Sequence, residues 1–286
     1  MKPLHLAVGR FNIDIIAKIE KIPSENSAGY SDIIEIFPGG SATNYAVAVN
    51  KFGHPVRLLA KVGNNPVVKA LMSIIAEMGV NLENIIEVLE EKSNNISLIF
   101  LRDEGKISIV RKIRPLLLLT SEEVSKLSGL FDVVHYSSVH PSLIVNNRGT
   151  KLTSYDPGPY ASEVENIRVD ILYVNENEYK LLKDKVDFKI MIIKMGRKGA
   201  KLISDKEECE AEAYAVDNVV DTTGAGDVFD AAFNYAYLEG MGIESSLAFA
   251  NIAAGIKVTR FGGISSPTLQ EVVKVLKTNP PKVRCK

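Results

Sequence analysis

Residues 220–229, VDTTGAGDVF, combine a glycine turn, a helix start and a carboxylate in one short stretch. Gly224 and Gly226 have no side chains, so backbone N–H groups can converge on an anion there. Apolar residues then recur at helical spacing from Val228 onward, and Gly240 is expected to end this helix. The N-terminus of a helix adds the positive end of its dipole. The stretch therefore predicts a site that holds phosphoryl oxygens.

The carboxylate of Asp227 is the second informative feature of this stretch. It would repel a permanently bound phosphate, so a base that takes a proton from an attacking hydroxyl is the better explanation. The N–H groups of Gly224, Ala225 and Gly226 would then form an anion hole for the transferring oxygens. A dinucleotide loop is a competing interpretation, but Phe229 stands where its third glycine belongs. An ordinary strand-to-helix turn is the other alternative. The full string favours phosphoryl transfer.

The string Asp-Thr-Thr-Gly-Ala-Gly-Asp at 221–227 resembles the C-terminal signature of the ribokinase-like carbohydrate kinases, also called the PfkB family. The N-terminal signature of that family, two glycines followed by an asparagine at the start of a helix, is matched at residues 39–46. Matching segments extend from about residue 9 to residue 266. The resemblance implies an α/β fold with a mainly parallel central sheet, flanking helices and a small β lid, in a single domain over residues 1–286.

Composition and charge exclude several other classes. The chain has 286 residues, 46% of them hydrophobic, which suits one large α/β domain. With 34 basic and 35 acidic residues the formal net charge is −1, so no nucleic acid or anionic membrane surface is expected as a partner. No apolar run approaches the length of a membrane helix, and the N-terminus does not resemble a signal peptide. A cytoplasmic protein with a small-molecule substrate is expected.

Apolar runs bounded by loops predict strands that are buried on both faces of a mainly parallel sheet. These runs are 4–8, 132–136, 152–155, 171–174 and 190–193. Two other β-rich regions, near 13–37 and 95–112, enclose polar turns and predict the lid.

The cysteines and histidines carry no recognisable metal or redox motif. Cys209 and Cys285 stand alone, without a Cys-x-x-Cys pair or a nearby histidine, and both are expected to be free thiols. Of the four histidines only His140, after an apolar strand and before Pro141, is a candidate for the pocket. The basic tail that begins at residues 280–281 is expected to be a frayed end.

The resemblance implies a substrate-binding set near the N-terminus. Short asparagine and aspartate side chains can offer a polyol fixed donors and acceptors with little loss of entropy. The set consists of Asn12, Asp14, Gly39, Gly40 and Asn44, with Asp227. Ser41 stands where ribokinases commonly carry lysine, so the resemblance does not imply that ribose itself is the substrate.

The resemblance also implies a nucleotide site on later strands. Asn175 and Glu178 match an Asn-x-x-Glu motif whose carboxylate would orient water bound to Mg²⁺, although the same residues could merely cap a helix. Lys194 replaces a threonine that the family often has, and it would either bind the donor phosphate or point to solvent. The nucleotide-binding set is Asn175, Lys194, Gly196, Lys198, Gly199, Gly224 and Asn251. The resemblance further implies a monovalent cation such as K⁺, held by Asp221 and Ser266.

These features together predict a kinase that transfers the terminal phosphate of ATP or ADP to a hydroxyl of a sugar or sugar phosphate. A nucleoside kinase is the alternative within the enzyme class. A non-catalytic sensor of sugars or nucleotides is the alternative outside it, because a fold alone does not establish activity. The exposed strand edges of the lid are expected to allow a homodimer.

Overall fold

The computed structural model describes residues 1–182 and 186–286. Within these residues the chain builds one large sheet in which seven neighbouring strands are parallel, while three antiparallel strands extend one edge. From that edge the strands are β14 (Val283–Cys285), β13 (Glu208–Ala211), β12 (Ala200–Ser204), β11 (Val186–Lys194), β10 (Ile167–Asn175), β9 (Leu152–Asp156), β8 (Val133–Ser137), β1 (His5–Val8), β4 (Val56–Gly63) and β5 (Ile85–Val88). The predicted α/β class with a mainly parallel sheet is confirmed.

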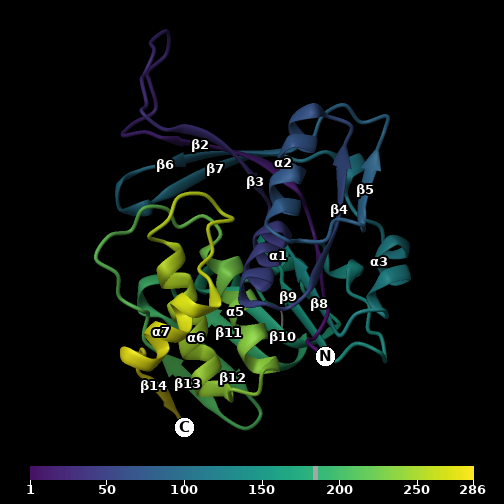
Figure 1. Ribbon diagram of the computed structural model, residues 1–286, viewed down its shortest axis with the longest axis vertical. Helices are drawn as coiled ribbons and strands as arrows, with labels where there is room; N and C mark the ends of the chain where they lie inside the picture. Colours follow the sequence, from purple (N-terminus) through teal and green to yellow (C-terminus); the bar gives the residue numbers. More distant parts are fainter. Residues whose placement is uncertain (183–185) are drawn as a thin grey trace.

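The central strands carry almost uninterrupted apolar sequence because helices or loops cover both faces of the sheet. Every residue of β1, β8 and β9 is buried. The helices packed on one face are α1 (Ser41–Phe52), α2 (Pro66–Glu77), α5 (Ala225–Leu238), α6 (Ile243–Lys257) and α7 (Leu269–Thr278). Helix α3 (Ser121–Ser128) packs on the other face, and the short α4 (Glu176–Tyr179) follows β10. Helices α5 and α1 thereby both approach the same end of the sheet (Figure 1).

A second sheet lies across that end of the body, at the top of the view in Figure 1. Its strands are, in order, β3 (Ile34–Gly39), β2 (Asn12–Lys18), β6 (Asn95–Leu101) and β7 (Ile107–Lys112). The turn between β6 and β7 reaches the loop before α5, where the Thr222 hydroxyl donates to the carbonyl oxygen of Gly105 at 2.8 Å. This sheet comes from the two segments predicted as the lid.

The chain changes direction across the large sheet beside β1. It runs from β1 to β4 and β5 on one side, then crosses through the small sheet and α3 to β8 on the other. In open α/β sheets, ligands bind outside the carboxyl ends of the strands at such a switch point. Arg10 follows β1 and Ser137 ends β8, so a ligand is expected in the crevice between the ends of these two strands.

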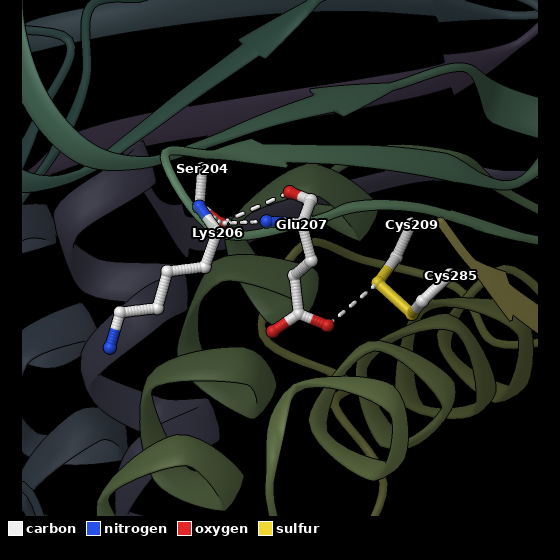
Figure 2. The surroundings of a disulfide bond; sticks show 5 residues. All are labelled: Ser204, Lys206, Glu207, Cys209 and Cys285. Atoms are coloured by element: carbon white, nitrogen blue, oxygen red, sulfur yellow. Dashed lines mark hydrogen bonds between the residues drawn. A yellow bond between two sulfur atoms is a disulfide. The ribbon is translucent and has the colours of Figure 1, made fainter.

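The prediction of two free thiols is wrong. Cys209 on β13 and Cys285 on β14 form a disulfide, with their Cα atoms 4.1 Å apart (Figure 2). The two residues lie opposite each other in an antiparallel pair, which brings side chains close. The C-terminal tail is therefore a strand at the edge of the large sheet rather than a frayed end. The two cysteines are 76 residues apart in the sequence, and no sequence pattern indicated that they pair.

In the described part of the chain, no helix has both the length and the apolar character needed to cross a membrane. His140, the one histidine predicted near the pocket, is half exposed and pairs with Glu163, with its Nε2 3.1 Å from a carboxylate oxygen. It does not line the cavity that contains Asp227.

Candidate active site

The anion turn, residues 221–227, is held in its shape by glycine. Gly224 has φ 77°, which favours glycine, and a Cβ there would lie 2.7 Å from the carbonyl oxygen of Gly263. The Ala225 N–H donates to the carbonyl oxygen of Thr222 at 3.2 Å. Among the described residues the N–H groups of Gly226 and Asp227 have no protein acceptor, as is usual in the first turn of a helix. These two groups and the α5 dipole are available to an anion.

Asp227 lies in the first turn of α5, where its Oδ2 accepts a hydrogen bond from Asn44 Nδ2 at 2.7 Å. Asn44 comes from α1, so this bond joins the two glycine signatures that lie far apart in the sequence. Burial raises the pKa of the Asp227 carboxyl, and the bond from Asn44 opposes that shift. A carboxylate with a raised pKa is a stronger base for a hydroxyl proton.

Asn12 and Asp14 lie on the same side of β2 and face Asp227 across the cavity. Gly39 leaves room for Asp14, since a Cβ on Gly39 would lie 1.9 Å from Asp14 Oδ2. Gly40, with φ 98°, allows α1 to begin close to the carbonyl of Arg10. Burial raises the pKa of Asp14 to about 6, and Ser97 and Arg111 oppose this shift.

Three buried side-chain oxygens in this group have no hydrogen-bond partner in the part of the chain that the structure describes. They are Oδ1 of Asn12, Asp14 and Asn44. Because buried polar atoms are nearly always paired, these three are available for a bound molecule. All three residues belong to the predicted substrate set.

The cavity around these residues has a volume of about 340 Å³. Of the residues predicted from sequence, it is lined by Asn12, Asp14, Gly40, Asn44, Asn175, Gly224, Gly226 and Asp227. Gly39 lies directly behind Asp14, and Ala225 lies within the turn. The structure thus brings residues from β2, α1, β10 and α5 into one site.

Comparison with known proteins agrees with this geometry. Residues 2–269 match the family described as pfkB family carbohydrate kinase. The chain belongs to this family of kinases. A ribokinase from Bacillus subtilis is 27% identical over 298 residues, which cover 94% of this chain and 98% of that protein. An ATP-dependent ribose-1-phosphate kinase from Halopiger xanaduensis is 24% identical, covering 95% of this chain and 97% of that protein.

A solved structure of Arabidopsis thaliana ribokinase with ribose and ATP superposes with a TM-score of 0.76. It is 25% identical to this kinase, and the match covers 98% of this chain and 100% of that one. The predicted enzyme class, a phosphotransferase with an alcohol group as acceptor, is therefore confirmed. The present chain is a sugar or nucleoside kinase that uses a nucleotide as phosphate donor.

Lys194 of this kinase lies in an environment that the sequence did not predict. Its Nζ is 2.6 Å from Asp156 Oδ2 and 2.9 Å from Asp230 Oδ1, and little of the side chain reaches solvent. Burial alone would lower the pKa of Lys194, but the two carboxyl groups outweigh it and raise that pKa. The ammonium lies beneath the anion turn, 3.3 Å from where a Cβ of Gly226 would be.

The two carboxyl groups around this ammonium differ. Burial raises the pKa of the fully buried Asp230 well above its usual value. At Asp156 burial acts in the same direction, but Lys194 outweighs it and lowers the pKa. One shared ammonium therefore compensates Asp156, while Asp230 favours its neutral form.

Asn175 and Glu178 form a capping box at the start of α4. The Asn175 side chain accepts from the N–H groups of residues 177 and 178, and Glu178 Oε2 accepts from the Asn175 N–H at 2.8 Å. The helix-capping alternative is thus observed. Burial, followed by the negative charge of Asp156, raises the pKa of Glu178 to about 7. That local excess of negative charge suits a cation such as Mg²⁺.

The candidate site for a monovalent cation is surrounded by side chains that are themselves cations. Asp221 accepts from the N–H groups of Thr223 and Gly262, at 2.8 and 2.9 Å. The Nζ of Lys257 donates to the carbonyl oxygen of Asp221 at 2.9 Å, and Lys51 donates to the carbonyl oxygen of Ser266, also at 2.9 Å. These residues do not fit a free K⁺ ion well.

Other predicted nucleotide residues lie outside the cavity. Gly196 and Lys198 lie on the turn between β11 and β12, where Lys198 Nζ pairs with Glu176 at 3.0 Å. Gly199 has φ 100° and packs against the carbonyl of Ala211. Asn251 is buried within α6, where its Nδ2 donates to the carbonyl oxygen of Leu247 at 2.9 Å. The described structure therefore does not bring Gly196, Lys198, Gly199 and Asn251 into the cavity that contains Asp227.

Sequence reasoning missed two basic residues that line the cavity, Arg10 and Arg111. A signal existed for Arg111, because residues 107, 109 and 111 alternate toward the inner face of the small sheet. Arg10 stands two residues before Asn12, at the end of a predicted strand.

Proposed function

We propose that this kinase transfers the terminal phosphate of ATP, or of ADP, to a hydroxyl of a sugar or sugar phosphate, with Asp227 as the base. The observation that carries the proposal is the position of the Asp227 carboxylate. It adjoins the free N–H groups of the anion turn on one side and the unpartnered oxygens of Asn12 and Asp14 on the other. A hydroxyl held by those oxygens would lie between the base and the phosphate.

In the proposed step, the acceptor oxygen attacks the terminal phosphorus and the bond from phosphorus to the leaving nucleotide oxygen breaks. The hydroxyl proton passes to Asp227. Negative charge on the equatorial oxygens is stabilised by the N–H groups of the anion turn and by the dipole of α5. Asn44 orients the carboxylate through its 2.7 Å bond. The small sheet covers the cavity and would exclude water from the transfer.

The lining of the cavity favours a sugar or sugar phosphate over a nucleoside. No aromatic side chain among the described residues lines it, and its polar residues include Ser97, Ser137 and Ser138. Ile99, Ile107 and Ile109 provide the apolar part of its wall. A nucleobase is commonly held by flat aromatic or apolar surfaces, whereas a polyol needs several short donors and acceptors. A nucleoside remains the alternative acceptor in the assay below.

We also propose that Mg²⁺ binds with the nucleotide and that Glu178 orients one of its water ligands. Mg²⁺ prefers oxygen ligands, retains several waters and neutralises charge on the phosphates. Support comes from the raised pKa of Glu178, which reflects burial and the nearby charge of Asp156. A cation there would restore the ionised carboxylate. Because ATP and Mg²⁺ are abundant in the cytoplasm, we propose that the kinase acts there.

A homodimer through the small sheet is also proposed. Ile36, Ile15, Leu98 and Val110 form one cross-strand row on its outer face, and all but Ile15 are exposed. Such a row is a candidate for burial against a second copy. Light scattering of Val110→Lys against the wild type tests it, since loss of a dimer is expected and a monomeric wild type would contradict it.

The test of the catalytic proposal is a donor-consumption screen. ATP and ADP are each tested with Mg²⁺ against neutral sugars, sugar phosphates and nucleosides. We expect turnover on a sugar or sugar phosphate, and a loss in Asp227→Asn of roughly 10²–10⁴-fold, the usual contribution of a general base. Binding of nucleotide to Asp227→Asn should persist, which separates a chemical defect from unfolding. Unchanged turnover in Asp227→Asn would contradict the assignment of the base.

A further inference from the structure

Arg10 and Arg111 bring two positive charges into the cavity that the proposed transfer does not use. Arg10 follows β1, and Arg111 lies near the end of β7 on the inner face of the small sheet. Among the described residues, neither guanidinium has a carboxylate at ion-pair distance. The pair therefore comes from two different sheets and converges on the space beside Asp14 and Asp227.

These two guanidinium groups act on each other. Burial lowers the pKa of Arg10, and the positive charge of Arg111 acts in the same direction. Two like charges repel each other unless an anion joins them. The geometry is therefore that of an incomplete ion cluster.

Several other basic residues of the chain have close carboxylate partners. Arg114 Nη2 lies 2.8 Å from Glu91, and Lys61 Nζ lies 2.7 Å from Glu123. Lys194 has two carboxyl partners. Arg10 is partly buried and has the Tyr160 side chain as a hydrogen-bond partner, whereas Arg111 lines the cavity as an exposed residue. Because neither has a carboxylate at ion-pair distance among the described residues, both can bind an anion that enters the cavity.

We propose that Arg10 and Arg111 bind a phosphate monoester on the acceptor, so that the acceptor is a phosphorylated sugar. A phosphate monoester carries between one and two negative charges at neutral pH and offers three acceptor oxygens, which match two guanidinium forks. This phosphate is not altered in the reaction. The transferred phosphoryl group goes to a separate hydroxyl held by Asn12 and Asp14, so the product is a sugar bisphosphate. The inference rests on the proposed function.

The experiment compares neutral sugars, their phosphate monoesters and the corresponding sugar acids as acceptors at fixed ATP and Mg²⁺. We expect the highest kcat/KM for a phosphate monoester. In Arg111→Gln the KM for that acceptor should rise roughly 10- to 100-fold, as expected when charge-assisted bonds are lost, while the KM for ATP stays unchanged. Lys112→Gln is the matched control, because it removes the same charge from the next position of β7, on the opposite face.

Three results would overturn the inference. One is a neutral sugar or a sugar acid preferred over every phosphate monoester, with turnover still lost in Asp227→Asn, because the proposed function would then stand without it. Another is an equal effect of Arg111→Gln and Lys112→Gln. The third is a calorimetric result. It would show that a phosphate monoester that serves as a substrate binds no more tightly to Asp227→Asn than to Asp227→Asn/Arg111→Gln. Absence of any Asp227-dependent turnover would instead remove the proposed function on which the inference rests.

A second inference rests on Lys257, at the end of α6. Its side chain is completely buried, and its Nζ donates to the carbonyl oxygens of Asp221 and Arg260 at 2.9 and 3.3 Å. The same Nζ lies 4.0 Å from Asp221 Oδ2. Carbonyl oxygens and one carboxylate are the ligands that a monovalent metal ion would use. Here an ammonium group already binds them.

Of the two oxygens of Ser266, the carbonyl is also taken by protein cations, while the buried hydroxyl has no hydrogen-bond partner among the described residues. The carbonyl oxygen of Ser266 accepts from Lys51 at 2.9 Å and from Arg260 at 3.3 Å. A free cation would have to share this space with three positive side chains and one buried carboxylate, Asp221. Repulsion disfavours that arrangement.

We infer that the Lys257 ammonium takes the place of a monovalent metal ion and braces the anion turn from within the chain. Asp221 links the turn to Gly262 on the following loop, at 2.9 Å, and Lys257 neutralises that link. The kinase should then need no K⁺. Lys257 is a positioning residue, since it touches neither the acceptor nor the base.

The experiment measures thermal unfolding in K⁺ and in tetramethylammonium chloride, so it does not depend on knowing the acceptor. We expect the same melting temperature for the wild type in both salts. In Lys257→Met, K⁺ should raise the melting temperature by roughly 3 °C or more, because an ion that binds only the folded state stabilises it. Lys51→Met is the control and should show no such gain. A wild type stabilised or activated by K⁺ would overturn the inference, and so would a Lys257→Met variant indifferent to K⁺.

Discussion

Lys194 and Lys257 approach the anion turn from different elements, and both are buried, yet their surroundings differ. Lys194, at the end of β11, has two carboxyl groups within 2.9 Å. Lys257, at the end of α6, has two carbonyl oxygens and a single carboxylate 4.0 Å away. Their pKa values move in opposite directions: that of Lys194 is raised, and that of Lys257 is lowered by burial to about 8.

Burial by itself therefore does not decide whether a side chain is charged. Desolvation disfavours both ammonium groups, and the partners decide whether it is outweighed. At Lys194 the adjacent carboxyl groups outweigh the cost of desolvation. Dipoles of carbonyl groups and a more distant carboxylate only partly do so at Lys257. The turn that carries Asp227 is thus supported by one strongly held cation and by one that can lose its proton.

The largest expected effect comes from removing the strongly held cation. Lys194→Met should lower the free energy of unfolding by about 3–5 kcal/mol, the usual cost of leaving a buried carboxylate without its partner. Urea unfolding of the wild type and the variant measures this. The loss should be smaller in Lys194→Met/Asp156→Asn, where the charged partner has been neutralised. A loss under 1 kcal/mol in the single variant would mean that water reaches these carboxyl groups.

The second prediction uses pH to discharge Lys257. Its pKa in the folded state, about 8, lies below the usual 10.5, so the unfolded chain binds more protons between these values. The free energy of unfolding should therefore rise with pH from about 8 to about 10.5, by at most about 3 kcal/mol from this residue, and show no such contribution below pH 8. Other groups titrate in the same range, so the measurement is the difference between wild type and Lys257→Met. A difference that is flat with pH would contradict it.

A third buried charge, the Asp14 carboxylate, has no ion-pair partner among the described residues and extends the comparison. Its folded pKa of about 6 lies above the usual 3.8, so its contribution to stability is present below pH 3.8 and is lost as the pH rises through 6. Asp14→Asn should then be more stable than the wild type at pH 8 by about 2 kcal/mol, while the KM for the acceptor rises. Melting curves and kinetics at pH 8 test both. A variant that is less stable at pH 8 would show that the carboxylate has a partner in solution.

The same contrast explains what the sequence could predict. Patterns that depend on neighbours in the chain were sufficient for the buried strands, for the glycine turn and for the shared face of Asn12 and Asp14. Such patterns could not predict contacts that depend on the order of the strands in the sheet. The partners of Lys194 come from β9 and α5, and the Cys209–Cys285 bond joins strands separated by 76 residues.

Arg111 belongs to the same group of contacts. It meets Arg10 only because the small sheet folds over the end of the large one. Spacing in the sequence says which face of a strand a residue occupies, but not what lies opposite that face.

The smallest expected effect belongs to Lys201, which pairs with Glu208 across β12 and β13. Its N–O distance is 2.6 Å, the same as between Lys194 and Asp156, but both side chains are partly exposed. Because water already solvates such a pair, Lys201→Met should change the free energy of unfolding by less than about 1 kcal/mol. Urea unfolding beside Lys194→Met compares two pairs of equal length and unequal depth. A loss at Lys201 as large as that at Lys194 would mean that distance, and not burial of the partner carboxylate, sets the cost of breaking an ion pair in this kinase.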